Sequence, residues 1–317
     1  MPNVLRERWS RDRDGSRSAS GNIDMPGLLA AWFADPAWRE EAFRLPPAER
    51  REILADIGRE AVVADTGRFG GELRWNLALL DWLWSGDARE DLALAHGAYL
   101  FSSLSDSLDF HGGTRPDSAC ETHGIAHIED ALARGRGVIL FAAYQSHPGY
   151  ALQGSALCAR RIGIVRKAEA AGGPSLMLAG VGDHVWEIGA TRTAARAMLA
   201  ALACNEIIAV YSDYVYPGAP TADGILFGRA FPIARALLAV AWRSGAALLP
   251  MAVARDGPGR TSSIAVRFFA DVRPGDDLDR ETWIAAAALK VGVAMECMIR
   301  LHPAQWRLWN TLRHRCR

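Results

Sequence analysis

Hydrophobic and polar positions follow two different rhythms along this chain. Between residues 26 and 95 apolar residues recur at helical spacing, with breaks at Pro46-Pro47 and at the glycine-rich stretch 67–71. No run in this part has the alternation or the β-branched content of a strand. The pattern predicts a helical amino-terminal extension over residues 23–110. The charged segment before it, residues 1–22, is expected to be a disordered tail.

From about residue 124 helical patterns alternate with short apolar runs that favour strands. The predicted strands cover 137–143, 162–166, 207–211, 248–253 and 263–269, and the predicted helices cover 124–134, 148–160, 192–204, 232–244 and 279–300. Such alternation is typical of α/β proteins. We expect residues 111–317 to form an α/β core with a mixed, largely parallel sheet flanked by helices.

Three polar residues lie at or just beyond the carboxyl end of a predicted strand: His147, Arg166 and Asp213. If these strands are parallel neighbours, the three residues share the sheet edge where ligands bind in open α/β folds. His147 precedes a proline at a predicted helix start, where it can take a proton from a hydroxyl or amine. Structural interpretations stay open: His147 as a capping or core residue, Asp213 as a turn cap and Arg166 as a surface ion-pair residue.

The amino-acid composition limits the classes of binding partner and the cellular compartments that are expected for this protein. Lys plus Arg equals Asp plus Glu at 36 each, so no steering toward nucleic acid is implied. The five cysteines are scattered, as expected for reduced thiols in a cytoplasmic protein. No uncharged apolar run reaches the ~18–20 residues that a membrane span needs. Peripheral membrane contact through Trp306, Trp309 and the basic carboxyl terminus is left open, with packing of that end as the favoured interpretation.

The motif Cys120-x-x-His123-x-x-x-His127 has the spacing of metal ligands on one helical face. It precedes the predicted sheet and has no fixed third ligand. We therefore expect a solvated helix start here, and no metal site.

Several short sequence blocks follow one another in an order that, taken together, is typical of a known enzyme superfamily. They are His147-Pro148-Gly149, Val165-Arg166, Ser212-Asp213-Tyr214, Leu226-Phe227-Gly228-Arg229, the Gly-Ala-x-x-x-Pro run at 245–250, and Pro303-x-Gln305-Trp306-x-x-Trp309. Together they make residues 124–317 resemble the lysophospholipid acyltransferase superfamily, especially its lipid A lauroyl/myristoyl acyltransferase-like branch.

That resemblance implies transfer of an acyl group from a carrier thioester to a hydroxyl or amine, with His147 as general base. The donor would be acyl carrier protein or acyl-coenzyme A, and no cofactor is implied. It also implies substrate-binding roles for Gly149, Arg166 and Phe227-Gly228-Arg229, although Phe227-Gly228 could instead make only a tight turn with Arg229 solvated. Without a membrane helix, a small-molecule or carrier-bound acceptor is expected.

The chain departs from the family pattern at one position. The acid expected five residues after the histidine is Leu152, so another carboxylate must orient the imidazole if the mechanism is kept. Asp213 is the favoured substitute because it follows a strand as His147 does, and Glu187 and Asp183 are weaker candidates. Two alternatives stay open: a non-catalytic acyl- or carrier-binding homologue, and a thioester hydrolase.

Overall fold

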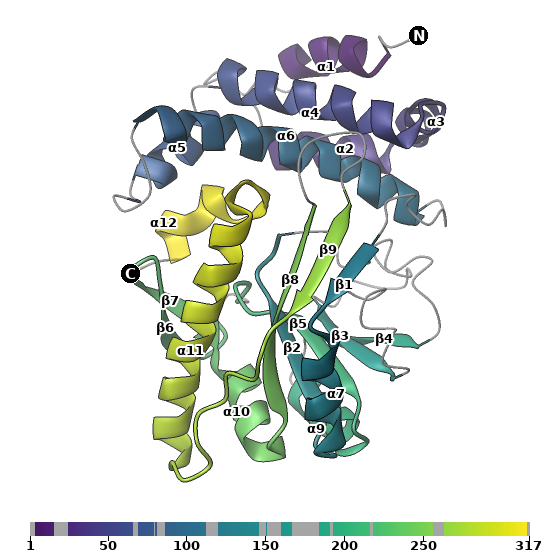
Figure 1. The fold of residues 1–317 in the computed structure, drawn as a ribbon. Coiled ribbons are helices and arrows are strands. Elements are labelled where there is room, and N and C mark those ends of the chain that lie inside the picture. Colours follow the sequence, from purple (N-terminus) through teal and green to yellow (C-terminus); the bar gives the residue numbers. More distant parts are fainter. Residues whose placement is uncertain are drawn as a thin grey trace. The chain divides into compact units, whose positions relative to one another are not determined.

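The chain forms two compact units (Figure 1). The helical unit comprises Met1–Ser118, Asp256–Ser262 and Pro303–Arg313, and the sheet unit comprises Ala119–Arg255, Ser263–His302 and His314–Arg317. The computed structural model describes residues 4–15, 25–65, 69–78, 80, 86–111, 120–145, 150, 160–166, 184–190, 193–215, 218–255 and 263–315.

The amino-terminal extension is helical, as predicted. Its helices are α1 (Val4–Gly15), α2 (Met25–Ala34), α3 (Pro36–Phe43), α4 (Pro47–Ala64), α5 (Gly70–Ala78) and α6 (Gly86–His111). Sequence signals define the start of α3, where the Asp35 carboxylate accepts the Ala37 N–H at 2.9 Å and proline follows the cap. The core holds an aromatic cluster in which Trp32 stacks on Trp38 and meets the edge of Phe101.

The prediction of a disordered tail over residues 1–22 is wrong for Val4–Gly15, which form helix α1. Leu5 and Trp9, four residues apart on one face, are each 1% exposed. The Trp9 ring meets Phe101 edge-on at 5.9 Å between centroids. Composition suggested disorder because this segment is highly charged. Part of that charge is neutralised locally, since Arg8 pairs with Asp12 and Asp35.

Helices α4 and α6 cross at a pair of glycines. A Cβ on Gly58 would lie 2.1 Å from the Gly97 carbonyl oxygen, and a Cβ on Gly97 would lie 2.5 Å from the Gly58 oxygen. The two backbones therefore touch where neither residue has a side chain. About two helical turns before Gly58 on α4, buried Arg50 pairs with Asp109 and donates from Nε to Ser105 Oγ at 2.8 Å. This pairing satisfies charges that would otherwise be costly to bury.

The carboxyl-terminal segment 303–313 belongs to the helical unit, which corrects the prediction that all of 111–317 forms the sheet unit. It contains the short helices η2 (Pro303–Gln305) and η3 (Trp309–Thr311). Trp306 and Trp309 are fully buried and meet edge-on at 4.7 Å. Packing, as favoured from the sequence, is what these tryptophans do. The segment follows the sheet unit in the sequence but packs with the helical unit. Its unit could not be predicted from sequence order, because it depends on which residues surround the segment in space.

The sheet unit has a seven-stranded mixed sheet in the order β1-β9-β8-β2-β5-β3-β4. Strands β8, β2, β5, β3 and β4 run parallel, β9 is antiparallel to β8, and β1 is parallel to β9. Their bounds are β1 (Cys120–His123), β2 (Val138–Ala142), β3 (Ile162–Arg166), β4 (Val185–Gly189), β5 (Ile207–Tyr211), β8 (Ala247–Arg255) and β9 (Ile264–Phe268). The predicted α/β class, with a largely parallel sheet, is confirmed.

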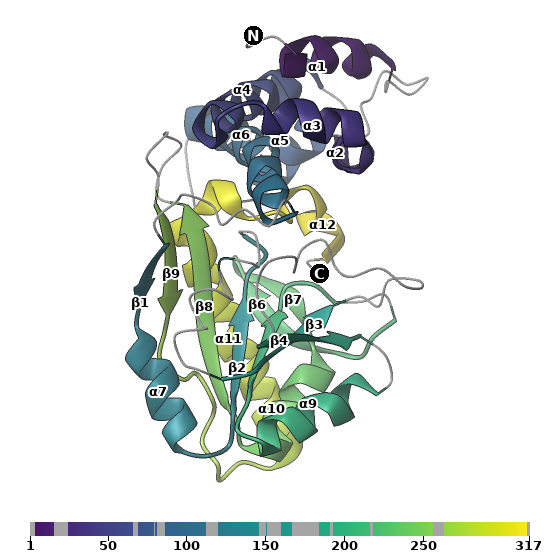
Figure 2. The same ribbon diagram turned by 90° about the vertical axis from the view of Figure 1, so that its right-hand side faces the viewer.

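Helices flank both faces of this sheet. They are α7 (Ile125–Ala133), α9 (Ala194–Ala203), α10 (Arg235–Ser244) and α11 (Arg280–Leu301). Helix α7 covers one face, and α9, α10 and α11 lie on the other (Figures 1 and 2). The predicted helices 124–134, 192–204 and 279–300 are present to within two residues at each end, whereas 148–160 falls almost wholly outside the described residues.

A separate hairpin, β6 (Thr221–Leu226) with β7 (Arg229–Ala234), was not predicted. The helix predicted to begin at Pro232 begins at Arg235 instead, and Pro232 pairs with Asp223 in the hairpin. Proline is tolerated here because β7 is an edge strand. The hairpin packs closely on α11: a Cβ on Gly292 would lie 2.4 Å from the Ile225 carbonyl oxygen.

Replacing Gly58 with alanine should test the α4–α6 crossing. The added methyl group has no room against the Gly97 carbonyl, so the helices must separate, and we expect a loss of about 1–3 kcal/mol in unfolding free energy. Val63→Ala on the same helix is a control, because Val63 is 60% exposed and should change stability by less than about 0.5 kcal/mol. Chemical denaturation measures both, and equal stability of the two variants would contradict the packing argument.

His96 should make the stability of the helical unit depend on pH. Burial, aided by the nearby charge of Arg307, lowers its pKa from 6.5 to about 4, although the Ala304 carbonyl that accepts from Nδ1 opposes the shift. The unfolded chain then takes up a proton below pH ~6.5 that the folded chain refuses until about pH 4. Stability is therefore lost as the pH falls through this window, by up to ~3 kcal/mol.

Denaturation of wild type and His96→Gln across that window measures this contribution. The variant should lose the His96 part of the slope, and the exposed-histidine control His127→Gln should keep it. Identical slopes for wild type and His96→Gln would show that His96 titrates normally.

Candidate functional site

The three strands that precede His147, Asp213 and Arg166 are parallel neighbours. Strand β5 lies between β2 and β3, with Val138 and Ile162 both in register with Ile207. The carboxyl ends of these strands therefore meet at one edge of the sheet, as the sequence argument required. Arg166 is the last residue of β3, and Asp213 lies two residues beyond β5.

The described part of β2 and its turn ends at Gln145. His147, Gly149 and Leu152 lie outside the described residues, as does Asp183, so their predicted roles stay predictions. The neighbours of His147 in the chain locate the site: Tyr144 and Gln145 precede it, and Tyr150 follows. Of the weaker candidates for the missing acid, Glu187 is an exposed residue of edge strand β4.

Asp213 holds the turn after β2. Its side chain is fully buried, and Oδ2 accepts the backbone N–H of Tyr144 at 2.7 Å. The backbone beside it is also joined to β2, since the Ser212 N–H donates to the Ala142 carbonyl at 3.1 Å. A buried carboxylate that accepts a backbone N–H fixes both partners. Asp213 thus connects the chain leaving β5 to the segment that leads to His147.

Gln145 attaches the same turn to α11. It is 1% exposed, and its Nε2 lies 3.1 Å from the Met298 carbonyl oxygen and 3.3 Å from that of His302. Met298 lies in the last turn of α11 and His302 is its C-cap residue, and carbonyls at a helix end lack N–H donors from the helix itself. The amide of Gln145 therefore caps a helix end and anchors the turn at a second point, two residues before His147.

Aromatic rings and arginines surround the turn. Tyr144 packs against Tyr211 with ring centroids 4.7 Å apart. Tyr150 is buried, and its hydroxyl lies 3.3 Å from Nη2 of Arg255, the last residue of β8. Arg315 donates to the Asp213 carbonyl at 3.0 Å and lies over the Tyr214 ring. Arg315, from the basic carboxyl terminus, is therefore held against the chain that follows β5.

Phe227 and Gly228 form the two-residue turn of the β6–β7 hairpin. Both have positive φ, 53° and 71°, as this tight connection requires. The Phe227 N–H donates to Glu296 Oε2 at 2.6 Å, and Glu296 also pairs with Arg300. The buried Phe227 ring and the exposed Arg229 fit the tight-turn interpretation, while the substrate-binding interpretation stays a prediction.

Helix α11 is common to the hairpin turn and the strand ends. Met295 contacts Ser212 after β5, Glu296 holds the Phe227 turn, and Met298 accepts from Gln145. These α11 residues lie within one turn of helix. The predicted block at 226–229 therefore shares a supporting helix with the strand-end residues, although its side chains are not shown to enter their site.

The possible metal motif has a different geometry from the one expected. Cys120 and His123 lie in strand β1, whereas His127 lies in α7. The two histidines are therefore not on one helical face, since only His127 lies in the helix that was predicted to begin at residue 124. Glu121 and His123, two residues apart on the same side of β1, approach to 3.6 Å.

Comparison with known proteins adds no family. Neither the protein-family models nor the curated proteins contain a match to this chain. The described residues also include no helix that is both long and apolar enough to cross a membrane.

Three supporting residues were not foreseen from the sequence: Gln145, Arg255 and Arg315. Gln145 follows β2 and Arg255 is the last residue of β8, so the strand-end rule that selected Asp213 would have found them. Arg315 had no such signal, because its contact with Asp213 spans 102 residues of sequence.

Asp213→Ala should destabilise the protein more than Asp213→Asn. Alanine removes the acceptor of the buried Tyr144 N–H, a loss of about 1.5–3 kcal/mol for a bond to a charged group. Asparagine keeps a carbonyl oxygen that can accept the same proton. Urea denaturation should rank the variants in this order, and Asp223→Ala, an exposed aspartate on β6, is the control. Equal losses for alanine and asparagine would show that the carboxylate acts in another way.

Proposed function

We propose that this protein is an acyltransferase that moves an acyl group from a carrier thioester to a hydroxyl or amine. The observation that carries the proposal is the anchored turn after β2. Buried Asp213 accepts the Tyr144 N–H, and the buried Gln145 side chain donates to the Met298 carbonyl. These two bonds anchor the chain just before His147, at the sheet edge where α/β proteins bind ligands. The ordered resemblance of residues 124–317 to acyltransferases supports the same chemistry.

In the proposed reaction His147 acts as the general base. It removes the proton of the acceptor hydroxyl or amine while that oxygen or nitrogen forms a bond to the thioester carbonyl carbon. The tetrahedral intermediate then collapses, the carbon–sulfur bond breaks, and the imidazolium returns the proton to the leaving thiolate. The products are an ester or amide and the free carrier thiol.

Asp213 is assigned two tasks in this proposal. It fixes the backbone three residues before His147, and it orients the imidazole in place of the acid that Leu152 replaces. Arg166, at the end of β3, is proposed to bind an anionic group of the substrate. Acyl carrier protein or coenzyme A would be the donor, and a small-molecule or carrier-bound compound the acceptor. The free cysteines fit a cytoplasmic location.

A binding protein without catalysis is the second candidate, and Leu152 in place of the family acid favours it. Incubation of the full chain with acyl-carrier and acyl-coenzyme A thioesters, with and without hydroxyl and amine acceptors, separates the possibilities by mass spectrometry. Acylated acceptor supports the transferase. Free acid and thiol without acylated acceptor would indicate a hydrolase, and thioester binding without turnover would indicate the binding protein.

His147→Ala should reduce acyl transfer by ~10²–10⁴-fold, the usual cost of losing a general base. Its unfolding free energy should stay within about 1 kcal/mol of wild type, as expected for a site residue that contributes little to packing. His127→Ala is the matched control, since His127 is an exposed histidine of α7. Transfer at the wild-type rate by His147→Ala would remove His147 from the mechanism.

A further inference from the structure

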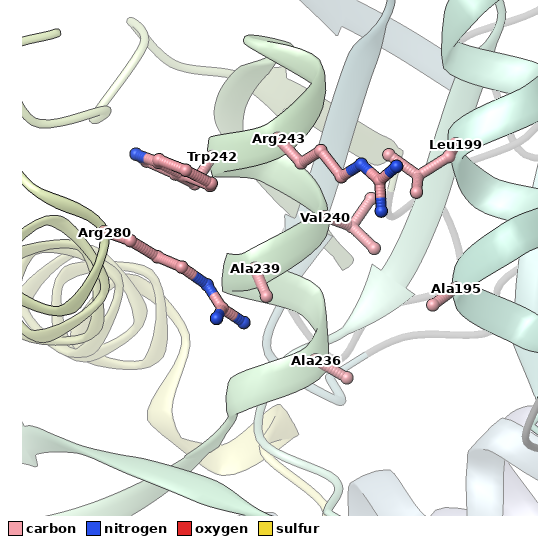
Figure 3. Close-up of a pocket in the computed structure, with 8 residues that line it drawn as sticks. All are labelled: Ala195, Leu199, Ala236, Ala239, Val240, Trp242, Arg243 and Arg280. Atoms are coloured by element: carbon pink, nitrogen blue, oxygen red, sulfur yellow. The ribbon is translucent and has the colours of Figure 1, made fainter.

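A groove runs over the outer surfaces of α9 and α10, with a volume of about 540 Å³. Its lining is Ala195, Leu199, Ala236, Ala239, Val240, Trp242, Arg243 and Arg280 (Figure 3). Trp242 and Arg243 lie in the last turn of α10, which leads into the amino end of β8. The end of the groove formed by Trp242 and Arg243 therefore lies toward the amino ends of the strands, whereas Asp213 follows the carboxyl end of β5.

The floor of the groove is apolar and made of small side chains. Ala236 and Ala239 are three residues apart on α10, and Ala195 faces them from α9. Such residues allow the backbone of a further helix to approach closely, because no long side chain separates the axes. A surface of this kind on paired helices suits an amphipathic helix that lays its apolar face between them.

Two exposed cations flank that floor. Arg243 and Arg280 are exposed, and in the described part of the chain neither guanidinium group makes a hydrogen bond or ion pair. Nearby, Arg235 pairs with Glu281 and Arg273 pairs with Asp271. No acidic side chain lines the groove, and the two guanidinium groups lie on either side of Ala239 and Val240 (Figure 3). The charge pattern is complementary to carboxylates.

Trp242 adds an aromatic anchor. It is 40% exposed and also lines a neighbouring pocket of about 360 Å³, which contains Arg136. Tryptophan and arginine are enriched among the residues that dominate binding energy at protein interfaces, whereas lysine and glutamate are depleted from interface cores. The groove has this composition.

We propose that this groove is a docking site for an acidic amphipathic helix of a partner protein. The apolar face of that helix lies on Ala195, Ala236 and Ala239. Its flanking carboxylates pair with Arg243 and Arg280, and an apolar side chain packs against Trp242. The inference goes beyond the proposed function and is independent of it.

The test is a display selection of helical peptides of random surface charge against the full-length protein. Selected peptides are then measured for binding to wild type, to Arg243→Glu/Arg280→Glu, and to Trp242→Ala. The control is Arg160→Glu/Arg196→Glu, which makes the same charge change at exposed arginines outside the groove. Circular dichroism melting confirms that each variant is folded.

The expected result is enrichment of acidic amphipathic peptides that bind at least tenfold more weakly to the groove variants and unchanged to the control. Raising the salt from about 0.05 M to about 0.5 M should weaken binding, because exposed charge pairs are screened. Peptides without acidic bias, or peptides that bind the charge-reversed groove as well as wild type, would overturn the proposal. Preferential binding of nucleotides or anionic vesicles at Trp242 would also overturn it.

Discussion

The candidate site depends on one hydrogen bond, from the backbone N–H of Tyr144 to the buried carboxylate of Asp213. A bond to a charged group away from water contributes about 1.5–3 kcal/mol, and an orphaned partner would cost a similar amount. The bond therefore holds two chain segments together as they leave neighbouring strands. His147 follows Tyr144 by three residues. The hydrogen bond therefore fixes the backbone from which the chain continues to His147.

The second support is helix α11, which contacts several of the segments that surround the site. Gln145 caps its carboxyl end, Ser212 contacts Met295, and Glu296 fixes the hairpin turn at Phe227. The hairpin can sit this close because Gly292 leaves room for the β6 backbone. A site held by a long helix and by strand ends is positioned more rigidly than one built on loops alone. This rigidity suits chemistry in which a base must meet a substrate proton at a defined distance.

The helical unit is organised by a different constraint, the contact of the α4 and α6 backbones at Gly58 and Gly97. On the same two helices buried Arg50 pairs with Asp109, which also pairs with Arg51. Burial requires these charges to be paired, since an unpaired charge away from water is costly. The same unit buries His96, whose neutral ring donates to the Ala304 carbonyl of the carboxyl-terminal segment.

The sequence alone determined the α/β class and the positions of the main strands. It also predicted His147 and Asp213 just beyond strands and Arg166 at the end of one. These features are local, because apolar periodicity and turn residues report the conformation of neighbouring positions. Strand ends then predict a common edge, and the parallel pairing of β2, β5 and β3 bears this out.

Only the tertiary structure decided which distant segments meet. Helix α1 looked disordered because its charge obscured Leu5 and Trp9, which are buried only by partners from other helices. The hairpin was not predicted, because Pro232 on its own is a helix-start signal. Pro232 can be a strand residue only because β7 is an edge strand. Gln145 and Arg315 gained their roles from contacts with Met298 and Asp213 that span 153 and 102 residues. No local sequence pattern predicts such long-range contacts, since they depend on which segments the tertiary fold brings together.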